Sequence, residues 1–169
     1  IQIPDRKPVR SRFQLVLDMS RKDVQNYLFD AISNILKSAD ISYVKWDMNR
    51  SINDWYSEKL DSKHQGELPH RYVLGLYALL ERLTSAFPDV MFEGCSGGGG
   101  RFDAGMLYYC PQIWCSDDTD AFERTKIQYG TSYIYPISAT GSHVSTVPNH
   151  QTGRITPFET RAVTAMAGR

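Results

Sequence analysis

The chain has 169 residues, which is enough for one domain with a substantial hydrophobic core. It carries 19 Lys and Arg residues against 19 Asp and Glu residues, so its formal net charge is zero, and no basic stripe indicates a nucleic-acid-binding face. Its apolar runs fall short of the roughly 20 residues that a membrane-spanning helix needs. From the charge and the apolar runs together, we expect neither a nucleic-acid partner nor a membrane.

The cysteines indicate a reducing compartment. Cys95, Cys110 and Cys115 show neither CxxC spacing nor an even count, which favours free thiols over a disulfide framework. We therefore expect a cytoplasmic location. The chain begins at Ile1 without an initiator methionine or a signal-peptide pattern, so we expect the natural start to lie upstream.

The first predicted unit is a strand followed by a helix. Phe13–Met19 is a nearly continuous apolar run that includes the carboxylate Asp18 near its end, as in a strand buried on both faces. Ser20 and Asp23 have the spacing of a capping box. Apolar residues then repeat at helical spacing over residues 24–36, which predicts an amphipathic helix.

The strand–helix unit then recurs. Tyr43–Asp47 is a second predicted strand, and a polar stretch separates it from a helix predicted over residues 70–87. Thr156 and Glu159 have the spacing of a second capping box, ahead of a final helix. Further strands are predicted at Val90–Cys95, Gln112–Ser116 and Tyr133–Ile137.

Strands that alternate with helices predict an α/β fold with parallel pairing and right-handed crossovers. A closed (β/α)8 TIM barrel needs eight strands and about 250 residues. The chain is therefore either an open α/β sheet or part of a (β/α)8 barrel, and we favour the barrel, with about five of its eight strands present. An incomplete barrel leaves strand edges and apolar helix faces uncovered, so we expect a homo-oligomer.

Asp47 ends a predicted strand, where the reactive groups of α/β folds gather. Side chains alternate along a strand, so Lys45, Asp47 and Asn49 are expected on one face. A Lys and an Asp are costly to bury unless they are paired or used in chemistry. Asp47 is thus a candidate carboxylate nucleophile, and a structural Lys45–Asp47 ion pair is an equally good interpretation.

A second acidic cluster ends another predicted strand, with three acids at Asp117, Asp118 and Asp120. Crowded like charges favour a protonated carboxyl that can act as a general acid. Two carboxylates that face each other across the opening of an active site suit glycoside hydrolysis, in which one attacks the sugar and the other protonates the leaving oxygen. Acids ahead of a helix are also a normal capping signature, which is the better interpretation for Asp118 or Asp120.

Neither a phosphate loop nor a metal site is indicated. Gly97–Gly100 lacks the Lys-Ser/Thr of a P-loop, so a turn, or a backbone that passes close to a ligand, is the better interpretation. The 4 histidines show no metal-ligand spacing, so no metal is expected.

Taken together, these segments resemble the α-galactosidases of glycoside hydrolase family 36, the melibiase-like enzymes. The resemblance covers essentially the whole chain, and its ordered series of motifs is highly specific. It is carried by Arg12–Asp18, Tyr43–Arg50, Phe92–Asp103, Trp114–Asp120, Tyr135–Pro136, Gly141–Ser145 and Pro148–Arg154.

The resemblance implies a retaining hydrolase in which Asp47 is the nucleophile and Asp117 the general acid/base. Lys45, Asn49 and Cys95 match positions that line the galactose subsite, and a further sugar-contacting position falls on Arg12. The implied substrates are terminal α-galactosides such as melibiose and raffinose-type sugars, with no cofactor. A transglycosylase similar to raffinose or stachyose synthases, or an inactive fragment with at most weak sugar binding, are the alternatives.

Complete members of this family also have an N-terminal β-sandwich, earlier barrel strands and a C-terminal β domain. Residues 1–169 are therefore expected to be a partial catalytic barrel domain. The motifs look more like those of the bacterial enzymes than those of the plant synthases, so hydrolysis and a bacterial source are expected.

Overall fold

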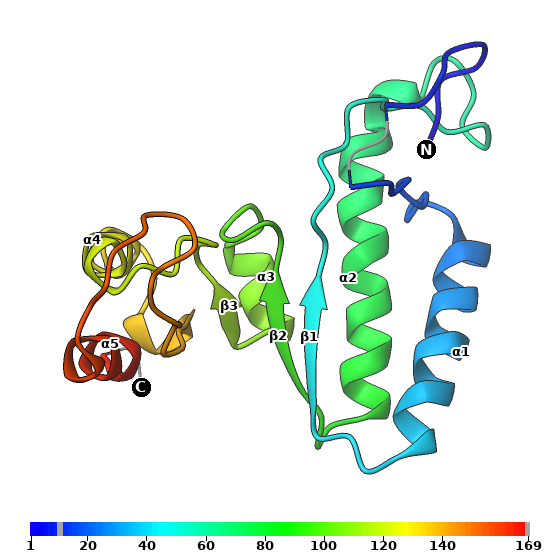
Figure 1. Cartoon of the computed structure of the whole chain (residues 1–169). Helices are drawn as coiled ribbons and strands as arrows, with labels where there is room; N and C mark the ends of the chain where they lie inside the picture. Colours follow the sequence, from blue (N-terminus) through cyan, green and yellow to red (C-terminus); the bar gives the residue numbers. More distant parts are fainter. Residues whose placement is uncertain (10–11, 168–169) are drawn as a thin grey trace. The chain divides into compact units, whose positions relative to one another are not determined.

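The structure is a computed structural model that describes residues 1–9 and 12–167. Helices and short strands alternate along the chain (Figure 1). The elements are α1 (Lys22–Ser38), β1 (Tyr43–Asp47), α2 (Leu68–Ala86), β2 (Met91–Cys95), α3 (Ala104–Tyr109), β3 (Gln112–Trp114), α4 (Ala121–Ser132), β4 (Thr140–Gly141) and α5 (Phe158–Met166), with 3-10 turns at Gln65–Glu67 and Ile137–Ala139.

Within the described residues the strands form one four-stranded sheet in the order β1-β2-β3-β4. β2 pairs in parallel with β3, with Glu93 opposite Gln112, and β3 pairs in parallel with β4, with Ile113 opposite Thr140. The expected α/β fold is confirmed. A spatial order that follows the chain order is that of consecutive (β/α)8 strands, whereas a doubly wound sheet reverses its order at a switch point. The barrel interpretation is thus favoured over the open sheet.

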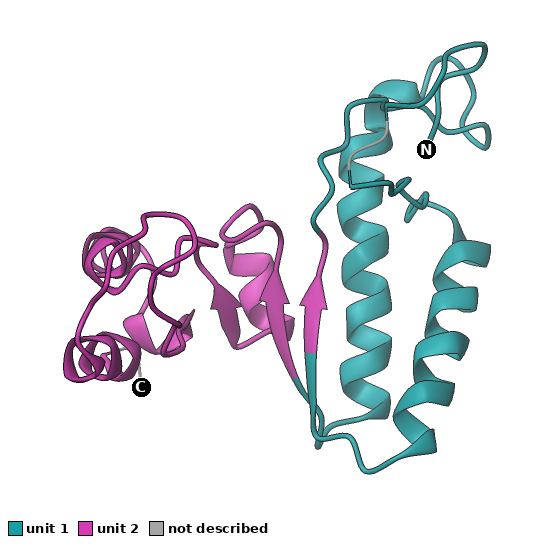
Figure 2. Cartoon of the chain, viewed as in Figure 1, with its two compact units in different colours: residues 1–44, 49–91 teal, residues 45–48, 92–169 magenta. Residues whose placement is uncertain are grey.

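The chain divides into two compact units, shown in different colours in Figure 2. Unit 1 contains residues 1–44 and 49–91, and unit 2 contains residues 45–48 and 92–169. The helices of unit 1 are α1 and α2, and unit 2 contains α3, α4 and α5. Each unit has its own core.

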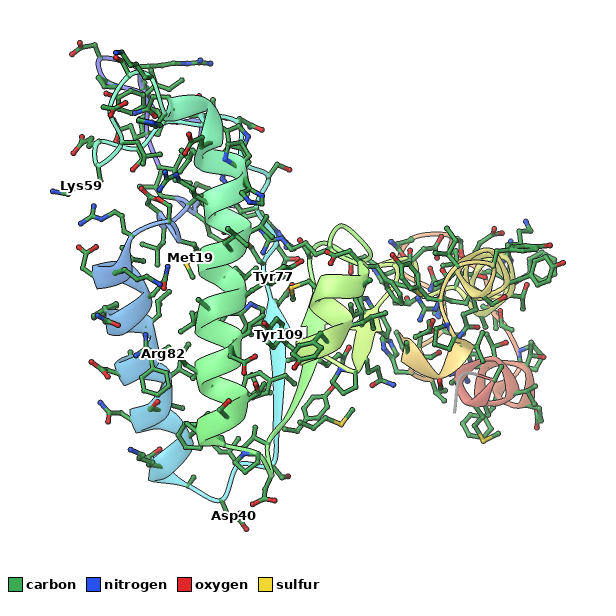
Figure 3. All side chains as sticks on the ribbon, turned by 180° about the vertical axis from the view of Figure 1, so that it is seen from behind. Met19, Asp40, Lys59, Tyr77, Arg82 and Tyr109 are labelled. Atoms are coloured by element: carbon green, nitrogen blue, oxygen red, sulfur yellow. The ribbon has the colours of Figure 1, made fainter. Side chains whose placement is uncertain are left out.

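In unit 1, α2 presents an apolar stripe and packs against α1. Leu76, Leu80 and Leu83 repeat at helical spacing and are buried. Arg82, labelled in Figure 3, reaches from α2 to α1, where its guanidinium donates to Asn26 Oδ1 at 2.8 Å and lies 4.2 Å from the ring centre of Phe29. This helix pair is therefore held by apolar packing and, through Arg82, by a hydrogen bond and a cation–π contact.

In unit 2 the core lies around the parallel strands and the helix pair α4–α5. Phe92 of β2 and Ile113 of β3 are almost completely buried. Gln128 of α4 is also buried, and its amide donates to the hydroxyl of Ser142 at 3.2 Å and to the carbonyl of Thr164 in α5 at 3.4 Å. The side-chain amide of Gln128 can be buried in this core because its nitrogen has these two hydrogen-bond partners.

The strand predicted over Phe13–Met19 is wrong. The segment is irregular apart from an isolated bridge at Gln14. Phe13 has a φ of 58°, in the left-handed region that interrupts an extended chain. Leu15 and Leu17 are exposed by 55% and 54%, so the run is not buried on both faces. Hydrophobicity indicated a strand here, but a strand also needs a hydrogen-bonded neighbour.

The strand predicted over Tyr133–Ile137 is also wrong. The amides of Tyr133 and Ile134 donate back to the carbonyls of Gly130 and Thr131, which continues the turn of α4. The strand in this region is β4, which begins three residues beyond the predicted end. By contrast β1 has its predicted bounds, and β2 begins one residue later than predicted.

Neither predicted capping box forms. Helix α1 begins after Arg21 and α5 begins after Pro157, and neither residue makes a side-chain cap. The hydroxyl of Ser20 instead donates to Asp18 Oδ1 at 2.6 Å. Asp18 also accepts a hydrogen bond from the hydroxyl of Ser57, so this buried carboxylate ties the loop after β1 to the start of α1.

Candidate active site

Asp47 lies at the carboxyl end of β1, and its position follows from strand alternation. Lys45 and Asp47 are exposed whereas Trp46 between them is half-buried and packs on Phe92, with ring centres 6.4 Å apart. The predicted common face is thus confirmed for Lys45 and Asp47, whereas Asn49 lies beyond the end of β1. The lysine pairs with Glu93, its Nζ lying 3.6 Å from Oε1 of that residue.

Cys95 ends the neighbouring strand β2 and lies against Asp47. Burial raises the pKa of the Cys95 thiol to about 11, and the hydrogen bond to Asp47 and its negative charge act in the same direction. A hydrogen bond with the backbone of Gly98 and the charge of Lys45 act against them. The strand ends are joined by two hydrogen bonds, from the amide of Met48 to the carbonyl of Cys95 at 3.0 Å and from the hydroxyl of Ser96 to the carbonyl of Met48 at 2.8 Å. Cys95 is therefore a protonated thiol beside Asp47.

Asp117 follows β3, and its side chain is connected to the last residue of that strand. The indole Nε1 of Trp114 donates a hydrogen bond of 3.1 Å to Asp117 Oδ1. The Nζ of Lys45 lies 4.5 Å from the ring centre of Trp114, within the range of a cation–π interaction. Lys45, Cys95, Asp47, Trp114 and Asp117 thus form one connected cluster in unit 2.

The glycine-rich turn after β2 packs directly on the backbone before Asp117. A Cβ on Gly98 would lie 2.9 Å from the amide nitrogen of Asp117, and a Cβ on Gly99 would lie 2.6 Å from the carbonyl oxygen of Cys115. Both distances are too short for any other residue type. The turn expected from the sequence is confirmed. Its glycines also allow a close approach of two backbones, which the sequence reasoning did not foresee.

The other two acids of the cluster are structural. Asp120 is 1% exposed and caps α4, accepting hydrogen bonds from the amides of Phe122 and Glu123. Thr152 and Arg154 also donate to it, and these bonds together outweigh burial and lower the pKa of Asp120. Asp118 accepts a hydrogen bond from the amide of Asp120 at 3.0 Å. The capping interpretation is confirmed for Asp120, whereas Asp118 bonds the amide of that N-cap residue and not a helical amide. Asp117 is left as the exposed carboxylate of this segment.

Three contributors to this site were missed by the sequence reasoning, namely Glu93, Trp114 and His143. Glu93 is 6% exposed, and burial raises the pKa of its carboxyl. The imidazole of His143 stacks on Trp114, with ring centres 4.7 Å apart and planes 1° from parallel, and burial lowers its pKa. A carboxylate inside the predicted strand Val90–Cys95 was a signal that could have identified Glu93.

The remaining predicted site residues belong to unit 1. Asn49 follows β1 and is half-buried. Arg12 has a φ of 53° and lines a pocket of unit 1 with Lys7, Pro8 and Phe13. Within unit 2, the structure brings Lys45, Asp47, Cys95 and Asp117 together, whereas Arg12 and Asn49 belong to unit 1.

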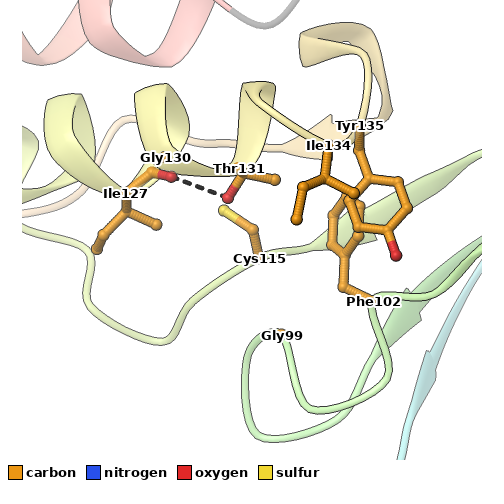
Figure 4. A pocket seen from close by; sticks show the side chains of 8 residues that line it. All are labelled: Gly99, Phe102, Cys115, Ile127, Gly130, Thr131, Ile134 and Tyr135. Carbon is orange, nitrogen blue, oxygen red and sulfur yellow. Dashed lines mark hydrogen bonds between the residues drawn. The ribbon is translucent and has the colours of Figure 1, made fainter.

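Gly99 of the glycine-rich turn also lines an apolar pocket of unit 2 (Figure 4). Its volume is about 370 Å³. Cys115 contributes a thiol whose pKa is raised by burial. The lining residues are Gly99, Phe102, Cys115, Ile127, Gly130, Thr131, Ile134 and Tyr135.

Among residues 1–9 and 12–167, no group of three or more His, Cys, Asp or Glu side chains is arranged to hold a metal ion. The three cysteines are free thiols. In the same part of the chain, no helix combines the length and the apolar character that crossing a membrane requires.

A comparison with models of protein families shows to which family this chain belongs. The family model described as Melibiase matches residues 1–169. The chain belongs to the melibiase family. The resemblance carried by the sequence motifs is thereby confirmed.

Curated and solved melibiase relatives are similar over nearly the whole chain. The bifunctional α-galactosidase/sucrose kinase AgaSK of Mediterraneibacter gnavus is 63% identical over 168 residues, which is 99% of this chain and 17% of that protein. The crystal structure of the GH36 α-galactosidase AgaA from Geobacillus stearothermophilus is 57% identical, with a TM-score of 0.96, over 99% of this chain and 23% of that one. Variants of AgaA have been solved in complex with raffinose and with stachyose. The chain thus spans 17% and 23% of the length of these two relatives.

Proposed function

We propose that the protein carrying this chain is a retaining α-galactosidase, and that residues 1–169 are part of its catalytic barrel domain. The observation that carries the proposal is the cluster at the carboxyl ends of β1, β2 and β3, in which Asp47 and Asp117 are the two exposed carboxylates. Reactive groups of barrel enzymes gather at this end of the strands.

Asp47 is proposed as the nucleophile. Its carboxylate attacks the anomeric carbon of the galactosyl group and forms a covalent galactosyl-enzyme while the glycosidic bond breaks. Asp117 is proposed as the general acid that gives its proton to the departing oxygen. In the second step Asp117 takes a proton from a water molecule whose oxygen attacks the anomeric carbon. The bond from that carbon to Asp47 breaks, and galactose is released with net retention.

Retention requires carboxyl groups about 5 to 5.5 Å apart, because the nucleophile itself must reach the sugar without an intervening water. In the AgaA variants solved with stachyose and with raffinose, an aspartate is replaced in each, and the two replaced aspartates are separated by the same number of residues as Asp47 and Asp117. This equal separation supports the choice of these two carboxylates.

The substrates proposed are raffinose-type sugars and melibiose, by analogy with the complexes of AgaA. We propose that Lys45, Asn49 and Cys95 bind the galactose, and that Arg12 makes a further sugar contact. Lys45 suits this role because its side chain is 43% exposed while its ammonium is paired with Glu93. No cofactor is needed in a mechanism that uses two carboxylates.

The test is release of nitrophenol from p-nitrophenyl α-galactoside, together with the anomeric configuration of the first galactose released, followed by NMR. We expect α-galactose first and a rate that falls by several orders of magnitude in Asp47→Ala. Wild-type activity retained in Asp47→Ala, or β-galactose as the first product, contradicts the proposal. A transfer product with sucrose as acceptor, at the expense of free galactose, would indicate a transglycosylase instead.

Two further properties follow as proposals. The free thiols Cys95, Cys110 and Cys115 favour a cytoplasmic location. Apolar side chains at the surface of α5, such as Phe158 and Val163, favour a homo-oligomer. A protein without activity that stays folded would support the remaining alternative, a fragment with at most weak sugar binding.

A further inference from the structure

Trp114 is held on several sides at the end of β3. The residue is 6% exposed. His143 stacks on its ring, and the guanidinium of Arg124 lies 4.6 Å from the ring centre, in addition to the ammonium of Lys45 at 4.5 Å. Arg124 is itself fixed, since it donates to the carbonyl of Ser116 at 3.1 Å. The indole therefore has little freedom to rotate.

The hydrogen bond from this indole distinguishes the two oxygens of Asp117. An indole nitrogen carries one hydrogen and accepts none. Because Nε1 of Trp114 donates to Oδ1, this oxygen is an acceptor in both protonation states of the carboxyl. The carbonyl oxygen of a protonated carboxyl is a better acceptor than its hydroxyl oxygen, so this bond favours the acid form with the proton on Oδ2. Asp117 is exposed, so without this bond its carboxyl could rotate and offer either oxygen.

We infer that Trp114 is a positioning residue for Asp117, which orients the carboxyl so that Oδ2 presents the proton to the departing oxygen. The inference rests on the proposed function of Asp117 as general acid, and it adds which oxygen acts and which residue selects it. The cations of Lys45 and Arg124 support this role, because positive charge near the ring strengthens the indole N–H as a donor.

The first part of the test examines the contact without using activity. Trp114→Phe assigns the indole N–H signal of Trp114 in the ¹⁵N spectrum of the whole chain. We expect that signal to shift strongly in Asp117→Ala and weakly in Asp117→Asn, whose amide oxygen still accepts. Trp55 lies in unit 1, and its signal is the internal control. An indole signal of Trp114 that is the same in wild type and Asp117→Ala overturns the inference.

The second part separates positioning from a merely structural role. Trp114→Phe keeps an aromatic ring and removes the indole N–H donor. Melibiose needs a proton for its leaving sugar, whereas p-nitrophenolate leaves without one. We expect kcat/KM to fall in Trp114→Phe by at least about tenfold for melibiose and by much less for p-nitrophenyl α-galactoside. Equal losses on both substrates overturn the inference. A folded wild-type chain that turns over neither substrate supports the inactive-fragment alternative, and the ¹⁵N comparison alone then tests whether Trp114 bonds to Asp117.

Discussion

A Cβ atom on Gly98 would lie 2.9 Å from the backbone nitrogen of Asp117. Gly98 also has a φ of 82°, which only glycine adopts without strain. Two independent constraints, backbone conformation and space, thus require glycine beside the proposed acid. The glycine-rich turn is a support for Asp117 within unit 2.

Gly98→Ala is therefore expected to displace Asp117 and lower activity. A displacement of 1 Å at a catalytic group can cost on the order of a hundredfold in rate, so we expect kcat on p-nitrophenyl α-galactoside to fall at least about tenfold. Gly130→Ala is the matched control, because nothing lies within 4 Å of a Cβ there and the residue is inside α4. The control is expected to be active and about 0.5 to 1 kcal/mol more stable, since alanine favours a helix. Comparable activity in both variants would contradict the support role.

The reactivity of Cys95 is expected to report the charge of Asp47. Burial and Asp47 hold the pKa of Cys95 at about 11, so its thiol should react slowly with iodoacetamide at about pH 9. Asp47→Asn removes the negative charge, lowers the pKa and should speed alkylation, by about two- to tenfold. Lys45→Gln removes the cation that lowers the pKa of Cys95, so this pKa should rise and alkylation should become slower.

The rates are measured by mass spectrometry in a background that carries Cys110→Ala and Cys115→Ala, so that Cys95 is the only thiol. Burial limits access of the reagent equally in each variant, and the opposite signs expected for Asp47→Asn and Lys45→Gln separate charge from access. If both substitutions change the rate in the same direction, the electrostatic explanation fails.

Asp120 is expected to stabilise α4 through its cap and its bond to Arg154. Asp120→Ala should lower the free energy of unfolding by about 2 kcal/mol at pH 7, the upper range for loss of an N-cap. The measurement is urea unfolding followed by circular dichroism. Asp23→Ala, which removes an exposed carboxylate paired with Arg21, is the control and should leave the urea midpoint unchanged.

The same variant has an expected pH dependence. The pKa of Asp120 lies below its ordinary value, so the folded state favours the carboxylate. Its contribution is present above the unfolded value of about 3.9 and is lost as the pH falls through the lower folded value. The difference between wild type and Asp120→Ala should therefore be constant near neutrality and shrink below about pH 4. A difference that grows on acidification would show that the charge is not what stabilises the cap.

Local pattern was sufficient for the elements with strong periodicity. The apolar stripe of Leu76, Leu80 and Leu83 predicted α2, and the alternation around Lys45 and Asp47 predicted β1 with its bounds. These signals are local because a helix face or a strand face is set by neighbours a few residues away. The site motifs could be identified for the same reason, since the acids stand at the ends of such elements.

Strand formation outside these elements could not be predicted locally. Phe13–Met19 is as apolar as a buried strand, yet it is irregular, whereas the short β4 forms because Thr140 pairs with Ile113. A strand exists only where a second backbone accepts and donates its hydrogen bonds, and hydrophobicity does not report that partner.

By itself the sequence determined the α/β class, the principal helices and the membership in the melibiase family, because these depend on periodicity and on ordered motifs along one chain. Only the tertiary structure decided the partners of the charged groups. It pairs Lys45 with Glu93, attaches Asp117 to Trp114 and leaves Asp120 as a helix cap. Such pairings depend on distances of 3 to 4 Å between residues on different strands and loops, and the folding of the backbone sets those distances.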